Sequence, residues 1–235
     1  MKRLMQVLIA VLTIVLAITF APGSAGADPV NTVTLSDWNT GHFTNNGGSG
    51  GPFRATTTGD LLGNSSFLTF CIEYNEHINY GASYLFTLSD GAISGGVSGG
   101  SPDPLSDATK WLYYQAVSGG YSSWYAGATG STLGSSVGAN MQYALWFLEG
   151  ERTASEIGGT GSAGYKLATY AQGQDWNTLS SQGHRVYAMN LTTVSGARVQ
   201  DQLAYAAPVP EPGSLILLGT GLAGGLRALR KRRRA

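Results

Sequence analysis

One stretch decides the fold of this chain: Phe67-Leu68-Thr69-Phe70-Cys71-Ile72-Glu73-Tyr74, which holds its only cysteine. Alternating β-favouring side chains predict a strand here, with turn-forming residues before it and Asn75-Glu76 after it. The more apolar face of this strand would consist of Leu68, Phe70, Ile72 and Tyr74. Cys71 would lie on the opposite face, with Glu73. A cysteine that only fills space is not expected on that less apolar face.

The N-terminal residues are typical of an export signal. A basic start, Met1-Lys2-Arg3, precedes an uncharged apolar run and the cleavage pattern Ala25-Gly26-Ala27. Residues 1–27 are therefore predicted to be a signal peptide, and the mature chain begins at Asp28. Export makes the single cysteine unusual, because it cannot form an internal disulfide in an oxidising compartment.

The formal net charge of zero conceals an uneven distribution. Six of the fourteen basic residues lie in the last nine positions. Between Asp28 and Pro212 there are six basic and fourteen acidic residues, a net charge of about −8. An acidic exported domain is a poor partner for nucleic acid, so none is expected.

The mature domain, residues 28–207, is predicted to be α+β. Strands are expected at residues 32–35, 52–57, 67–74 and 81–88, and again at 185–191 and 199–205. Helices are expected from an N-cap at Asp103 to Gly119, and at residues 137–149 and 163–171. This order predicts a β-sandwich or barrel-like subdomain with an inserted helical subdomain.

The C-terminal segment, residues 208–235, joins Pro210-Glu211-Pro212 to a short uncharged apolar run and an arginine-rich end. These features resemble the PEP-CTERM sorting signal. The resemblance implies a short transmembrane segment, transient anchoring in the inner membrane of a Gram-negative bacterium, processing by an exosortase, and release to the cell surface or extracellular matrix. The alternative, an ordinary C-terminal anchor with its basic end inside, does not explain Pro-Glu-Pro.

Two short strings resemble the signatures of the Cys–Gln thioester domains of bacterial surface adhesins. They are Phe70-Cys71-Ile72-Glu73 and Gln142-Tyr143-Ala144-Leu145-Trp146. Met141 stands where that family usually has threonine, and the family is best known from Gram-positive surfaces. The resemblance implies a thioester between Cys71 and Gln142 that attaches the protein covalently to an amine or a polysaccharide hydroxyl on a partner surface.

The residue types suit this chemistry. A thiolate is a strong nucleophile, and a carboxamide is a poor electrophile that reacts only when it is held in place. Well-oriented groups reach effective molarities of about 10⁵ M or more. Trp146, one helical turn after Gln142, would exclude water, and Glu73 would assist proton transfer. Each molecule would act once, so we expect neither an enzyme nor a cofactor or metal.

Other functions stay open. Cys71 alone is more often a small buried hydrophobe, and a glutamine beside an apolar helix face is commonly a solvated neighbour. The twelve tyrosines and five tryptophans are compatible with a non-covalent matrix or carbohydrate-binding protein. His77, six residues from Cys71, allows a Cys–His hydrolase, although no third residue accompanies the pair. His42, His77 and His184 lack the spacing of metal ligands.

Overall fold

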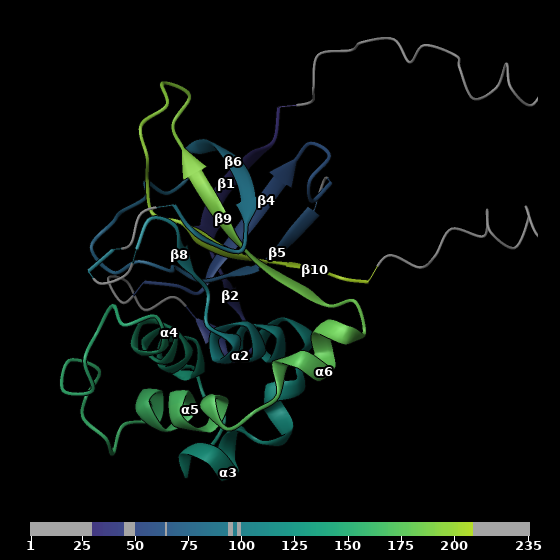
Figure 1. Cartoon of the computed structure of the whole chain (residues 1–235). Helices are drawn as coiled ribbons and strands as arrows, with labels where there is room; N and C mark the ends of the chain where they lie inside the picture. The colour runs from purple at the N-terminus through teal and green to yellow at the C-terminus, as the bar shows by residue number, and fades with distance from the viewer. Residues whose placement is uncertain (1–29, 45–49, 64, 94–95, 98–99, 209–235) are drawn as a thin grey trace, which may run out of the picture.

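The computed structural model describes residues 30–44, 50–63, 65–93, 96–97 and 100–208. The predicted signal peptide and the sorting segment after residue 208 lie outside these residues. Within the described part, strands and helices form the predicted mixed architecture, with a sheet at one end and helices gathered at the other (Figure 1).

The main sheet has six antiparallel strands in the order β10-β9-β6-β1-β4-β5. Their bounds are β1 Thr32–Asp37, β4 Phe53–Thr58, β5 Ser65–Thr69, β6 Ser83–Ser89, β9 Arg185–Thr192 and β10 Gln202–Ala206. Two small ribbons flank the sheet: β2 Asn39–Thr40 with β3 Phe43–Thr44, and β7 Gly91–Ala92 with β8 Asp103–Pro104.

The sheet is nearly closed into a barrel, because the chain that leaves β5 pairs with the start of β10. Ile72 N donates to Asp201 O over 3.1 Å, and Leu203 N donates to Phe70 O over 3.0 Å. Between them, Cys71 and Gln202 form an isolated antiparallel bridge. Pairing of the two edges satisfies backbone groups that an open sheet would leave to solvent. Cys71 therefore lies in the seam of the barrel.

The helices are inserted between β8 and β9. Their bounds are α2 Asp107–Ser118, η1 Gly120–Ser123, α3 Tyr125–Thr129, α4 Val137–Leu148, α5 Ala163–Gln172 and α6 Trp176–Ser181. Figure 1 shows them together on one side of the sheet. A buried hydrogen bond ties them to the seam, since Tyr113 Oη on α2 donates to Leu68 O over 2.7 Å. The predicted helical insertion is confirmed.

Two buried clusters hold these parts together. One joins β1, β4, β6 and β9 through Val33, Ala55, Phe86 and Leu191, and it includes Cys71. The other packs α2, α4 and α5 against β5 and against residues of β9 and β10. The chain around Cys71 contributes to both clusters, because Phe70 and Ile72 belong to the second.

This double burial corrects the expectation for residues 67–74. The regular strand ends at Thr69, and only Cys71 continues the pairing, as an isolated bridge. Both faces are buried: Thr69, Cys71 and Glu73 are each at most 1% exposed, whereas Tyr74 is exposed. Cys71 is thus buried between the two clusters. The predicted alternation is confirmed, because Leu68, Phe70 and Ile72 belong to one cluster and Cys71 to the other. The sequence did not predict that both faces would be buried.

The predicted start of the first helix was also wrong. Asp103 and Pro104 form β8, and the helix begins at Asp107 after Ser106, whose hydroxyl accepts from Thr109 N over 3.1 Å. Serine satisfies a first-turn N–H as readily as aspartate does, so Ser106 caps the helix in place of Asp103. The helix ends before Gly119, as expected.

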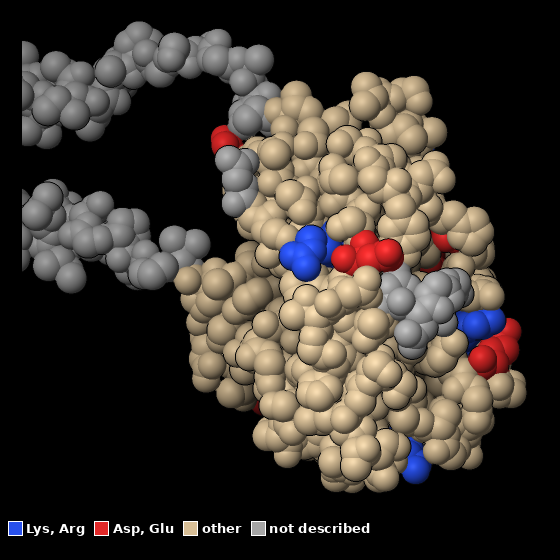
Figure 2. Space-filling model, turned by 180° about the vertical axis from the view of Figure 1, so that it is seen from behind, with Lys and Arg blue, Asp and Glu red and all other residues tan. Residues whose placement is uncertain are grey.

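The surface carries little charge. Viewed from behind, it shows scattered basic and acidic side chains and no large patch of one sign (Figure 2). Within the residues that the structure describes, no helix is both long and apolar enough to cross a bilayer.

Candidate functional site

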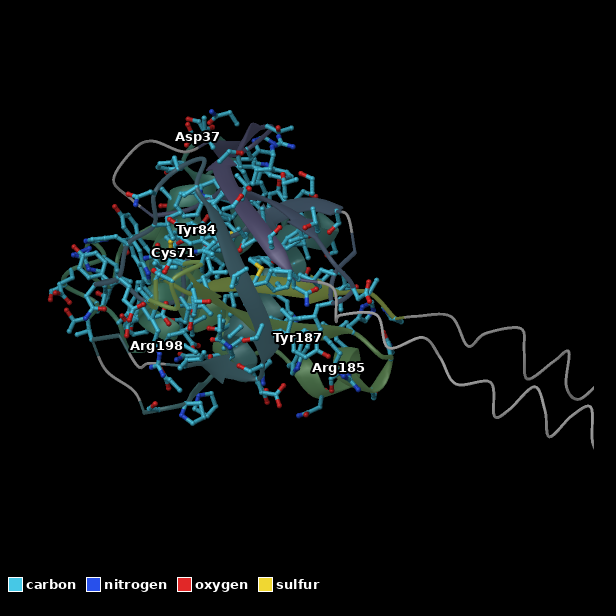
Figure 3. All side chains as sticks on the ribbon, turned by 90° about the horizontal axis from the view of Figure 1, so that it is seen from above. Asp37, Cys71, Tyr84, Arg185, Tyr187 and Arg198 are labelled. Atoms are coloured by element: carbon cyan, nitrogen blue, oxygen red, sulfur yellow. The ribbon has the colours of Figure 1, made fainter. Side chains whose placement is uncertain are left out.

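Cys71 is enclosed in the protein interior, with 1% of its surface exposed. It belongs to the same buried cluster as Phe53, Tyr84 and Trp146. Figure 3 shows Cys71 and Tyr84 in the same part of the interior. Burial raises the pKa of the thiol to about 12, because a thiolate would lose its hydration there. At neutral pH, Cys71 is therefore a thiol.

Gln142 on α4 lies against the backbone of Cys71, 71 residues earlier in the chain. Its Oε1 accepts from Cys71 N and from Gly51 N, each over 3.0 Å, and its Nε2 donates to Cys71 O over 2.9 Å. The side chain is fully buried. Two N–H groups converging on one carbonyl oxygen polarise the carbonyl and can stabilise an oxyanion.

Glycine at position 50 lets the chain approach this helix closely. Its φ is +71°, a left-handed conformation, and a Cβ there would lie 2.6 Å from Trp146 and 2.9 Å from Gln142 Cγ. The next residue, Gly51, supplies the N–H to Gln142. Both requirements, positive φ and no side chain, are met only by glycine.

Two further glutamines contact the thiol, and sequence reasoning missed them. Cys71 Sγ donates to Gln200 Oε1 over 2.9 Å, and Gln202 Nε2 donates to Cys71 Sγ over 3.7 Å. Both come from the barrel seam, where β10 begins. The signal in the sequence was Gln200-Asp201-Gln202, three polar residues inside a predicted apolar strand, which indicates buried polar groups with specific partners.

Glu73 and Asp201 form a buried pair of carboxyl groups behind the thiol. Asp201 N donates to Glu73 Oε2 over 2.9 Å, while the Asp201 carboxylate accepts from Leu191 N over 2.8 Å. Burial, reinforced by Asp201, raises the pKa of Glu73 to about 9. Burial also raises the pKa of Asp201 to about 6. Both carboxyl groups therefore hold their protons more tightly than exposed carboxyl groups do, and the pKa of Glu73 is raised further than that of Asp201.

Trp146 covers the site on its outer side. It is 3% exposed, its Nε1 donates to Glu73 O over 3.3 Å, and its ring meets that of Tyr74 edge to face at 5.0 Å. A groove of about 540 Å³ opens beyond it, lined in part by Trp146 and Gln200. Trp146 and Gln200 thus form a wall between this groove and Cys71.

The structure brings together Cys71, Gln142, Glu73 and Trp146, the four domain residues singled out by the sequence. The other predicted site residues, Ala25, Ala27, Pro210, Glu211 and Pro212, lie outside the described residues.

The three histidines lie apart from one another. His77 lines the groove, His42 packs against Tyr121, and His184 Nδ1 lies 2.7 Å from Tyr205 Oη. The hydrogen bonds of Cys71 Sγ go to glutamines. Among the described residues, no group of three or more His, Cys, Asp or Glu is placed to hold a metal ion.

Fold and site together define a mixed α/β domain whose barrel seam buries a cysteine against a helix glutamine. Residues 208–234 match the PEP-CTERM protein-sorting motif. This match indicates a protein that is sorted by exosortase and exported to the cell envelope or surface. No curated protein and no solved structure matched the chain.

Proposed function

We propose that this exported domain forms a thioester between Cys71 Sγ and Gln142 Cδ and uses it to attach covalently to a partner surface. The observation that carries the proposal is the position of the Gln142 carboxamide. It is fully buried against Cys71, and its oxygen receives two backbone N–H groups. A glutamine that only neighboured an apolar helix face would be solvated and would not make these buried hydrogen bonds.

Thioester formation replaces the nitrogen on Gln142 Cδ with the sulfur of Cys71. Cys71 Sγ attacks Gln142 Cδ, negative charge develops on Oε1, and the N–H groups of Gly51 and Cys71 stabilise it. The C–N bond then breaks, and the thiol proton leaves with the nitrogen as ammonia. Because the thiol is protonated at neutral pH, intramolecular positioning has to supply most of the rate.

The same site would perform the second step. An amine or a hydroxyl attacks Gln142 Cδ, the C–S bond breaks, and Cys71 recovers its thiol. The amide or ester that remains is covalent and each molecule reacts once, so the domain acts as an adhesive and not as an enzyme. Burial of Trp146 and Gln142 supports protection of the thioester from hydrolysis until an acceptor arrives.

The test is uptake of methylamine by the exported protein, followed by intact mass and peptide mapping. The proposal predicts one methylamine on residue 142 and none in Cys71→Ala. Cys71→Ser is a closer structural match, and it should also fail to take up methylamine. Uptake at another residue, or uptake in either variant equal to that of the unaltered protein, would refute the thioester.

The alternative is a non-covalent matrix or carbohydrate-binding protein. The exposed rings of Tyr74 and Tyr80 beside the groove favour it as the second candidate. In that case Cys71 and Gln142 would remain unmodified, and binding to a polysaccharide would be reversed by dilution or denaturation.

A further inference from the structure

The groove leads to the proposed thioester. Two of its lining side chains contact the Cys71 environment directly: Gln200 accepts from Cys71 Sγ, and Trp146 donates to Glu73 O. Its volume of about 540 Å³ lies within the range of small-molecule sites. An acyl acceptor therefore has room to approach from this side.

Three rings line the groove at every third position of one short segment: Tyr74, His77 and Tyr80. Tyr74 is 38% exposed and Tyr80 is 53% exposed. Each tyrosine is backed by a buried ring, Tyr74 by Trp146 and Tyr80 by Phe53 at 5.5 Å. Exposed aromatic rings gathered in a concave site mark a binding surface.

The segment is fixed near both ends. Tyr74 N donates to the buried carboxylate of Glu151 over 2.7 Å, and Asn79 N donates to Tyr84 Oη over 2.7 Å. Tyr84 is itself buried in the barrel cluster. The rings are thus held in place before any ligand arrives, which lowers the entropic cost of binding.

The groove offers a lysine side chain no charged partner in its described lining, which includes no carboxylate. The guanidinium of Arg152 lies 3.7 Å from the centre of the Tyr74 ring, so a second cation beside this ring would be repelled. A sugar ring, in contrast, is uncharged and offers a C–H face to aromatic rings and hydroxyls to polar groups.

From these observations we infer that the acyl acceptor is a hydroxyl of a neutral polysaccharide whose sugar ring packs on Tyr74 and Tyr80. The inference rests on the proposed thioester. The hydroxyl oxygen bonds to Gln142 Cδ while the C–S bond breaks. His77, which lines the groove, accepts the hydroxyl proton, and the released Cys71 sulfur takes up a proton from solvent, leaving an ester and a thiol. A hydroxyl needs such a base more than a neutral amine does, and imidazole is the usual one.

The experiment uses the exported protein and follows adduct formation by intact mass. The acceptors are a panel of neutral oligosaccharides (glucan, mannan, galactan and N-acetylglucosamine oligomers), glycerol, methylamine and a peptide with one lysine. We expect at least one oligosaccharide to couple about ten-fold faster per hydroxyl than glycerol, and faster than the lysine peptide, which corresponds to one favourable ring contact.

Variants separate recognition from reactivity. Tyr74→Ala and Tyr80→Ala should each slow oligosaccharide coupling more than methylamine coupling. His77→Ala should do the same, since methylamine needs the base less. The matched control is Tyr187→Ala. Tyr187 lies on β9, and Figure 3 labels it away from Cys71, so this substitution should change neither rate.

The two possible failures are distinguishable. If methylamine couples but no oligosaccharide is faster than glycerol, or if the lysine peptide is fastest, the sugar inference is overturned and the thioester stands. If no ammonia is lost and methylamine does not couple, the proposed function itself falls, and the inference with it.

Discussion

Gln142 uses its carboxamide entirely on main-chain groups of Gly51 and Cys71. Gln200, in contrast, accepts from the thiol and donates to Glu73 O over 2.7 Å. Both carboxamides lie beside Cys71, but only the oxygen of Gln142 has two backbone N–H donors. This difference makes Gln142 the better electrophile.

Substitution of each glutamine tests that choice. Gln142→Ala should abolish the loss of ammonia, while Gln200→Ala should retain it, more slowly because the thiol has lost an acceptor. Intact mass with peptide mapping measures both. If Gln200→Ala removed the ammonia loss and Gln142→Ala did not, the acyl group would belong to residue 200.

Gly50 offers a second test at this scale. Gly50→Ala should lower the free energy of unfolding by about 1–3 kcal/mol more than Gly63→Ala, because its methyl group would overlap Trp146. Gly63 is the matched control, since its φ of +65° imposes the same backbone strain with no atom within 4 Å. Urea unfolding of both variants gives the difference. Equal losses in the free energy of unfolding would mean that Trp146 moves aside for the methyl group without cost.

The raised pKa of Glu73 predicts a pH dependence of stability. Between the usual value of 4.5 and about 9, the folded protein keeps a proton on Glu73 that the unfolded chain releases. The free energy of unfolding therefore falls as pH rises through this window, by up to about 1.4 kcal/mol per pH unit.

Glu73→Gln, a neutral isostere, should flatten that slope, whereas the exposed Glu156→Gln should leave the fall in place. Urea unfolding across the window measures the slope. A wild-type free energy of unfolding that rises with pH there, or an unchanged slope in Glu73→Gln, would contradict the protonated state assigned to Glu73.

At the scale of elements, the helical insertion is attached to the barrel seam through Tyr113. Its hydroxyl donates to Leu68 O over 2.7 Å and lies 3.1 Å from Leu203 O, so α2 bridges β5 and β10 beside Cys71. Tyr113→Phe should cost about 1–3 kcal/mol in the free energy of unfolding, since buried carbonyls lose a donor.

The control is Tyr114→Phe on the same helix, whose ring packs on His184 and Tyr205 instead. It should stay within about 0.5 kcal/mol of the wild type. Thermal or urea unfolding compares the two. Similar losses would show that the hydroxyl of Tyr113 does not hold the seam.

Sequence periodicity predicted most elements but not the way they meet. The helices around Leu112, Gln142 and Leu167 were identified because apolar residues recur there at helical spacing and glycine or serine lies near their ends. Helix α6, Trp176–Ser181, was missed because six residues are too few to show a period.

The candidate site was predictable only in part. Cys71 and Gln142 were found through short strings, and Glu73 and Trp146 through their spacing from these two. Gly51, Gln200 and Gln202 were not found, because their roles arise from closure of the barrel between strands that are distant in sequence. Local patterns do not encode which edge strands meet.

At the scale of the whole molecule, the chain combines a reactive-site candidate with a sorting motif at residues 208–234. Replacing Pro210-Glu211-Pro212 by alanines should leave the C-terminal segment attached in cells that contain an exosortase. Pro208→Ala, just before the triplet, is the control. Mass spectrometry of the C-terminal peptide measures processing, and normal processing of the triple variant would contradict the assignment.

The central claim is the bond between Cys71 and Gln142. The most direct measurement is the intact mass of the exported protein, purified without reductant or amine buffer, with peptide mapping of residues 71 and 142. The account predicts a mass one ammonia below the sequence value and a link between these two residues. The full sequence mass, with a free thiol at Cys71 and an unmodified carboxamide at Gln142, would contradict it.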